Sequence, residues 1–117
     1  WEPFEPSDFT GPTSPLSIKK VPHEDIYIAV YNPTPAPEDR PSYTWGRTPL
    51  VIRTSTDGCR TFGESIVIED DPESGYCYTA MHFTDVSLLL ADCAGGPEDI
   101  VCLNRLRIRK IPLDGLI

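Results

Sequence analysis

Residues 53–65 read RTSTDGCRTFGES and stand between two apolar, strand-like runs, PLVI and SIVI. An Asp-Gly pair between such runs predicts a tight hairpin turn. A two-residue turn, however, explains neither Ser55, two residues before Asp57, nor Thr61 and Phe62, four and five residues after it. The stretch therefore predicts a larger, structured turn that joins two antiparallel strands.

Strand-like sequence continues on both sides of this turn. The seven runs that read as strands are residues 16–21, 25–31, 48–55, 64–70, 76–83, 86–93 and 103–111. No apolar period of 3.6 residues persists for three helical turns, so the pattern predicts an all-β fold. The lengths of the connections group the strands as four and then three. A four-stranded meander of this size is typical of one propeller blade, and a seven-stranded sandwich fits the same count.

Two segments differ from the strands in composition. Residues 1–15 contain four prolines and predict an extended surface segment ahead of a folded region, residues 16–117. The connection at residues 32–47 is long, proline-rich and aromatic. Loops of this length in a compact domain are more often functional than idle, so we expect it to contribute to a site.

Charge and hydropathy narrow the possible partners. Eighteen acidic and ten basic residues give a formal net charge of −8, which disfavours nucleic acid as a partner. No apolar run is long enough to span a bilayer, so we expect a soluble chain with no membrane partner. Because the sequence opens at Trp1 without an initiator methionine, we expect a piece of a longer protein. That protein would be secreted or periplasmic if a signal precedes Trp1.

The four cysteines do not form a metal-binding pattern. There is no C-x-x-C pair and no histidine at zinc-ligand spacing, so we expect neither a metal nor a cofactor. Free thiols packed as small hydrophobic groups are favoured. Pairing of Cys93 with Cys102 across a hairpin stays open, because disulfide geometry does not follow from spacing.

Residues 55–62, STDGCRTF, resemble the Asp-box, or bacterial neuraminidase repeat, of the sialidase family, Ser-x-Asp-x-Gly-x-Thr-Trp. Two positions depart from that pattern: glycine comes one residue early, with cysteine in its place, and phenylalanine replaces tryptophan. The resemblance implies that the matching residues shape a turn between the third and fourth strands of a blade. They are Ser55, Asp57, Gly58, Thr61 and Phe62.

The flanking sequence extends the resemblance. An Asn-Pro pair at 32–33, Arg47 at the head of a strand, the turn at 55–62 and Tyr78 within GYCYTAM follow one another in the order found in sialidases. The resemblance implies that residues 16–117 form the last two blades of a six-bladed β-propeller, the second lacking its outer strand.

The same resemblance implies an activity, that of an exo-α-sialidase. Such an enzyme removes terminal sialic acid from glycoconjugates by a retaining mechanism with a tyrosine nucleophile. Arg47 would bind the sugar carboxylate through its planar guanidinium, and Tyr78 would attack the anomeric carbon. Since the acid–base aspartate and the glutamate base lie outside this chain by analogy, we expect the chain alone to be inactive. The open alternatives are Tyr76 for the nucleophile and Arg40 or Arg53 for the carboxylate.

A non-catalytic reading also fits these residues: a carbohydrate-binding or structural propeller piece. In either case the expected partners are a sialylated glycan or related acidic sugar, and the rest of the propeller or further copies of the chain. Tyr76 and His82 are expected on the Tyr78 face, His82 as a structural group. The basic run RLRIRK, residues 105–110, is expected to form the solvated face of an edge strand.

Overall fold

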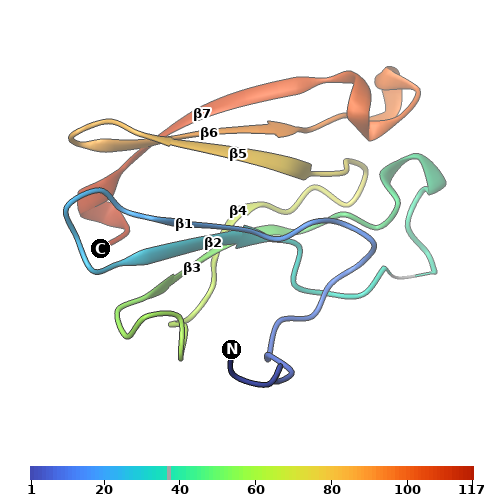
Figure 1. Ribbon diagram of the computed structural model, residues 1–117. Helices are drawn as coiled ribbons and strands as arrows, with labels where there is room; N and C mark the ends of the chain where they lie inside the picture. Colours follow the sequence, from blue (N-terminus) through green and yellow to red (C-terminus); the bar gives the residue numbers. More distant parts are fainter. Residues whose placement is uncertain (37) are drawn as a thin grey trace.

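A computed structural model describes residues 1–36 and 38–117, and its regular structure is all-β (Figure 1). Within these ranges there is no α-helix, only four short 3₁₀ turns. The seven strands fall on the seven predicted runs, which confirms the all-β prediction. They are β1 (Ser17–Lys20), β2 (Tyr27–Tyr31), β3 (Leu50–Ser55), β4 (Ile66–Glu69), β5 (Cys77–Phe83), β6 (Ser87–Cys93) and β7 (Leu106–Pro112).

The strands form two antiparallel sheets, one of four strands in the order β1-β2-β3-β4 and one of three in the order β5-β6-β7. This division into four and three is the one that the connection lengths predicted. The sheets lie face to face, and the N-terminal segment runs along the far side of the four-stranded sheet (Figure 1). The described residues form no closed barrel.

The core lies between the two sheets. Because side chains alternate along a strand, one face of each strand supplies it. Ile28 and Ile52 of the four-stranded sheet, and Leu88 and Leu90 of the three-stranded sheet, are at most 1% exposed. Full burial of each such side chain stabilises the fold by about 1.5–3 kcal/mol relative to exposure.

Polar contacts join the sheets at both edges. On the β1–β5 side, Thr79 Oγ1 donates to Ser17 Oγ at 2.9 Å, and Ser17 Oγ donates to the Thr79 carbonyl at 3.1 Å. On the β4–β7 side, Arg107 and Arg109 both donate to Glu69. The sheets are thus fixed at two separate lines of contact.

The pairing with Glu69 overturns one expectation. Arg105, Arg107 and Lys110 are exposed as expected, but Arg107 and the partly buried Arg109 do not lie on the outer face of the edge strand. They turn toward the opposite sheet, where Glu69 supplies an acceptor, and the apolar residues between them take the outer face. Leu106 is 68% exposed and Ile108 is 69% exposed.

A bulge at the start of β5 separates the two candidate tyrosines. The pairing register shifts between Cys77 and Ala80, and Tyr78 has a positive φ of 52°. As a result Tyr76 is 2% exposed and packs in the core, while Tyr78 is 49% exposed. The prediction that both share one face was therefore wrong, because regular alternation does not hold across a bulge.

The turn at residues 55–62 is held by its own side chains. Ser55 Oγ accepts from the Cys59 backbone N–H at 3.0 Å. Asp57 accepts from both the backbone N–H and the hydroxyl of Thr61, at 2.9 and 2.5 Å. These bonds replace the backbone pairing that the irregular segment lacks.

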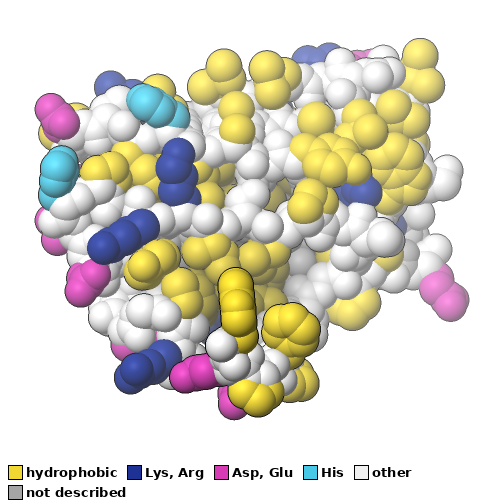
Figure 2. Space-filling view, viewed as in Figure 1, with side chains coloured by type: hydrophobic (Ala, Val, Ile, Leu, Met, Phe, Trp, Pro, Cys, Tyr) yellow, Lys and Arg dark blue, Asp and Glu magenta, His cyan; other side chains and the backbone are white. Residues whose placement is uncertain are grey.

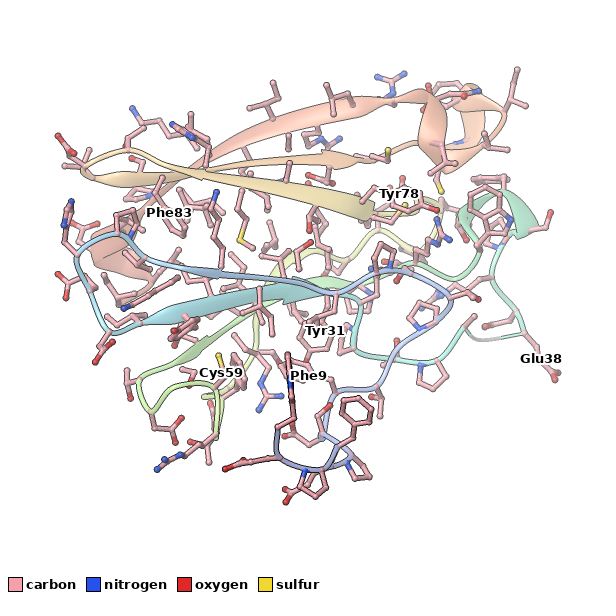
Figure 3. The ribbon with its side chains drawn as sticks, in the orientation of Figure 1. Phe9, Tyr31, Glu38, Cys59, Tyr78 and Phe83 are labelled. Atoms are coloured by element: carbon pink, nitrogen blue, oxygen red, sulfur yellow. The ribbon has the colours of Figure 1, made fainter. Side chains whose placement is uncertain are left out.

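The aromatic ring that ends this turn anchors the N-terminal segment. Phe62 makes an edge contact with Phe9, whose ring in turn meets Tyr31 of β2, with centroid separations of 4.9 and 4.8 Å. Figure 3 shows Phe9 rising from the N-terminal segment toward Tyr31. The segment at residues 1–15 is thus irregular but tied to the sheet by this contact.

The described residues contain no disulfide, no metal-binding cluster and no helix that could span a membrane. The four cysteines are free thiols, and no disulfide links them. No group of three histidine, cysteine or acidic side chains is arranged to hold a metal ion there. In the same ranges, no helix has the length and apolar character needed to cross a membrane.

Candidate anion-binding site

Arg47 is a buried cation that lacks an anionic partner. It ends the predicted loop at 32–47, of which residue 37 lies outside the described residues, and it stands three residues before β3. The residue is only 7% exposed, yet no carboxylate of the described ranges pairs with it. Burying a charge without an opposite charge beside it costs free energy of folding. An anionic ligand that bound beside this guanidinium would offset that cost.

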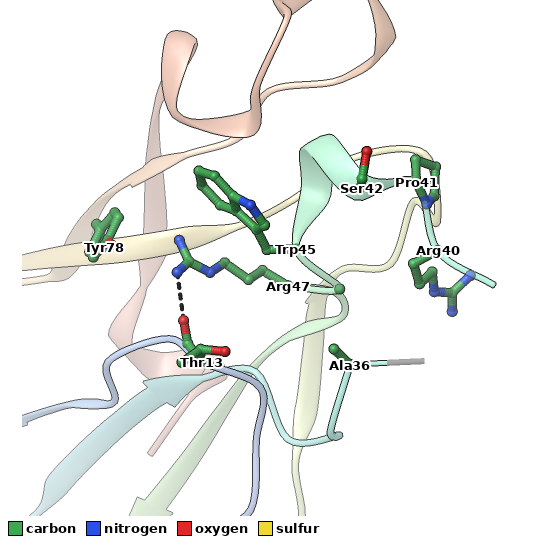
Figure 4. A pocket seen from close by; sticks show the side chains of 9 residues that line it. Thr13, Ala36, Arg40, Pro41, Ser42, Trp45, Arg47 and Tyr78 are labelled. Carbon is green, nitrogen blue, oxygen red and sulfur yellow. Dashed lines mark hydrogen bonds between the residues drawn. The ribbon is translucent and has the colours of Figure 1, made fainter. Parts of the chain in front are cut away.

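The partners that Arg47 does have are neutral. One terminal nitrogen donates to Cys77 Sγ at 3.2 Å, and the other donates to the Thr13 carbonyl at 2.5 Å (Figure 4). Burial raises the pKa of the Cys77 thiol to about 11, so the sulfur is uncharged at neutral pH. The Nε atom is buried and has no hydrogen-bond partner among the described residues. These contacts fix the orientation of the guanidinium and leave its charge uncompensated.

Two aromatic rings flank the guanidinium. Its central carbon lies 4.8 Å from the centre of the Trp45 ring and 5.1 Å from that of Tyr78. Both distances are within the range of cation–π attraction. In the space-filling view, hydrophobic side chains gather at the right of the face shown, with Lys or Arg side chains among them (Figure 2).

Arg47 and Tyr78, predicted separately for carboxylate binding and nucleophilic attack, line one pocket. The pocket has a volume of about 530 Å³ and opens beside the 3₁₀ turn Ser42–Thr44 (Figure 4). Trp45, at the end of that turn, has a left-handed φ of 50°, which directs the chain back toward β3. The remaining lining residues are Thr13, Ala36, Arg40, Pro41, Ser42 and Gly46.

The other candidate residues lie in different surroundings. Arg53 donates to the carbonyls of Phe62 and Gly63 and pairs with Asp8 at 3.5 Å, so its charge is already used in holding the 55–62 turn. Arg40 lines the same pocket as Arg47, and its Nε is likewise buried without a partner. His82 is exposed on β5 and does not line this pocket.

Several residues of the pocket were not predicted. Trp45 and Thr13 belong to segments without regular structure, and only the aromatic character of the loop at 32–47 pointed toward a site. Cys77 read as one more buried hydrophobic residue, because nothing in the sequence connects it to Arg47, 30 positions earlier. The pairing exists because β5 starts beside the chain that enters β3: the Tyr76 N–H donates to the Arg47 carbonyl at 2.7 Å.

Chemically, the pocket can hold a planar anion. Each terminal nitrogen of Arg47 keeps one N–H beyond its bond to Cys77 or Thr13, and a carboxylate can accept from these groups. The exposed part of Trp45 offers an apolar surface for a ring. The half-exposed Tyr78 lines the same pocket. Comparison of the chain with protein-family models, curated proteins and solved structures found no match in any of the three.

Proposed function

We propose that this chain is the C-terminal part of a sialidase-like glycoside hydrolase, an exo-α-sialidase that cleaves terminal sialic acid from glycoconjugates. The observation that carries the proposal is the buried guanidinium of Arg47, without a carboxylate partner, beside the accessible ring of Tyr78. Sialic acid bears a carboxylate on its anomeric carbon, so one ligand would engage both residues.

The reaction divides between the two side chains. Arg47 would hold the carboxylate and so fix the anomeric carbon in front of Tyr78. The phenol oxygen would give its proton to the glutamate base and form a bond to that carbon, while the aglycone oxygen leaves with a proton from the acid–base aspartate. Water, giving its proton to that aspartate, would then displace the tyrosine oxygen, which takes its proton back, and release the sugar with retained configuration. A neutral phenol suits this attack, because a carboxylate nucleophile would be repelled by the carboxylate of the substrate.

The number of sheets and strands in the fold is compatible with two propeller blades. Two stacked antiparallel sheets of four and three strands, with a side-chain-bonded turn between β3 and β4, would be the last two blades of a six-bladed propeller. The partners of such a piece are the rest of its propeller or other copies of the chain. The acid–base aspartate and the glutamate base would come from elsewhere, so the chain alone should not turn over a fluorogenic sialoside.

A second candidate is a non-catalytic carbohydrate-binding or structural propeller piece. One observation favours it: among the described residues that line the pocket there is no carboxylate to serve as the base for Tyr78. Catalytic groups that act as a unit lose nearly all their effect when one is missing.

The test is whether the 117-residue chain binds N-acetylneuraminic acid through its charge. We expect saturable NMR shifts at Trp45 and Tyr78, and much weaker binding of the methyl ester, which has the same ring without the charge. Arg47→Gln should remove the preference for the acid. Binding of acid and ester with equal affinity would refute a carboxylate site at Arg47.

A further inference from the structure

Asn32 lies behind the pocket and connects three segments that meet there. It directly follows β2, is 3% exposed, and both its amide nitrogen and its amide oxygen form hydrogen bonds. Its Nδ2 donates to the carbonyls of Pro49 and Tyr76, each at 2.9 Å, and its Oδ1 accepts from Ser14 Oγ at 2.7 Å. A buried amide with every contact made fixes the backbone of each partner.

Through Tyr76, Asn32 connects the two residues of the pocket. The carbonyl of Tyr76 accepts from Asn32, and its backbone N–H donates to the carbonyl of Arg47 at 2.7 Å. Tyr78 follows two residues later, at the bulge. The separation of the Arg47 guanidinium from the Tyr78 ring therefore depends on where Asn32 holds the start of β5.

The N-terminal segment closes over the same point. Residues 10–14, here called the strap, bond to Pro33 through Thr10 at 2.6 Å, to Asn32 through Ser14, and to Arg47 through the Thr13 carbonyl. The strap runs very close to the backbone just after β2. A Cβ atom on Gly11 would lie 2.5 Å from the Asn32 carbonyl oxygen. Only glycine fits this approach without a shift.

We propose that Asn32 is the positioning residue of this site and that the strap completes it. Asn32 sets the backbone that brings Arg47 and Tyr78 together, and the strap supplies a neutral carbonyl that orients the Arg47 guanidinium toward an anion. The inference concerns the same site and rests on the proposed function for its ligand. It also assigns the N-terminal segment, which the sequence placed outside the folded region, to the binding site.

The first test uses Asn32→Asp in the 117-residue chain. This change keeps the side-chain shape but replaces both donors by an oxygen that faces two carbonyls. We expect the NOEs between the Arg47 side chain and the Tyr78 ring to disappear while the sheet resonances persist. Because Arg47 would no longer be held in place, its contact with the ligand carboxylate should be lost. Binding of N-acetylneuraminic acid should then weaken about tenfold or more.

The second test displaces the strap and leaves Asn32 unchanged. If Asn32→Asp does not fold, this test alone decides whether the strap positions Arg47. Gly11→Ala should displace the strap and weaken the same binding, with the sheets intact. Gly115→Ala is the matched control, since a Cβ there meets nothing within 4 Å, and it should change neither quantity.

The outcomes separate the two proposals. If the unaltered chain does not bind N-acetylneuraminic acid, the sialidase proposal fails, and the NOEs of the ligand-free variants still decide the positioning role. If Asn32→Asp or Gly11→Ala folds and keeps both the Arg47–Tyr78 NOEs and the affinity, the positioning role is overturned. A lower melting temperature alone does not count in its favour, because a purely structural residue would produce it.

Discussion

Arg47 donates to Cys77 Sγ at 3.2 Å, so a neutral sulfur occupies a place where a buried arginine would ordinarily meet a carboxylate. The substitution Cys77→Asp supplies that carboxylate from within. We expect the new internal ion pair to compete with the ligand and weaken binding of N-acetylneuraminic acid about tenfold or more, as measured by NMR titration. Cys77→Ser, which keeps a neutral acceptor, should stay within a few-fold of the parent affinity. Equal binding by the aspartate variant would contradict an anion site at Arg47.

Tyr78→Phe separates chemistry from packing. In the complete parent protein, loss of the hydroxyl should lower kcat for a sialoside by several orders of magnitude, because the covalent route is removed. Stability should change by less than about 0.5 kcal/mol, since the ring is half-exposed. Tyr76→Phe, at a core position, is the control and should leave turnover near normal. Near-normal turnover in Tyr78→Phe would rule out this residue as nucleophile.

The lowered pKa of Asp57 makes the stability of the 55–62 turn sensitive to acid. The hydrogen bonds from the Thr61 hydroxyl and backbone hold the pKa of its carboxyl at about 2, below its value of about 4 in an unfolded chain. A depressed pKa contributes stability that is present above about pH 4 and is lost as the pH falls toward 2. Asp57→Asn should therefore melt below the parent at pH 7, with the difference narrowing between pH 4 and pH 2. A difference that does not change with pH would show that the charge of Asp57 plays no part.

Asp92 predicts the opposite pH dependence. The residue is 1% exposed, and neither carboxylate oxygen has a hydrogen-bond partner in the part of the chain that the structure describes. Burial raises its pKa to about 6 although Arg107 lies opposite on β7. Because the folded pKa exceeds the unfolded one, stability falls as the pH rises from about 4 to 6, by on the order of 3 kcal/mol. Denaturant unfolding of Asp92→Asn should lack this decline. A parent stability that rises across the same interval would contradict the prediction.

The outer face of the three-stranded sheet predicts self-association of the isolated chain. Leu106 and Ile108 are exposed on β7, the edge strand of that sheet, and unpaired edges with apolar side chains recruit other strands. Light scattering of the 117-residue chain should show species larger than a monomer. Ile108→Lys should shift the distribution toward monomer, while a stable, sharply melting monomer without this change would favour a self-contained sandwich over a propeller piece.

The strands were the part of the structure that the sequence predicted best. Alternating apolar runs and turn residues are local signals, and they located all seven strands and the division into two sheets. The facing of individual residues was harder to predict. Tyr76 and Tyr78 point in different directions because of a bulge that has no clear signal in the sequence. Arg107 and Arg109 turn toward the other sheet because Glu69, which accepts their hydrogen bonds, lies there. The site shows the same division: Arg47 and Tyr78 could be named from motifs, whereas Thr13, Trp45 and Cys77 depend on contacts between distant segments.

The two lines of contact between the sheets differ in reach. At the β1–β5 edge the short hydroxyls of Ser17 and Thr79 touch directly, whereas at the β4–β7 edge two long arginine side chains extend to Glu69. Because two hydroxyls meet only when their strands are close, whereas an arginine reaches further, we expect the sheets to be tilted and to lie closer together at the β1–β5 edge. Further sheets added with the same tilt would bend the stack into an arc around that narrow edge, so the curvature of a larger assembly would be set by five side chains and by the difference in length between a hydroxyl and a guanidinium.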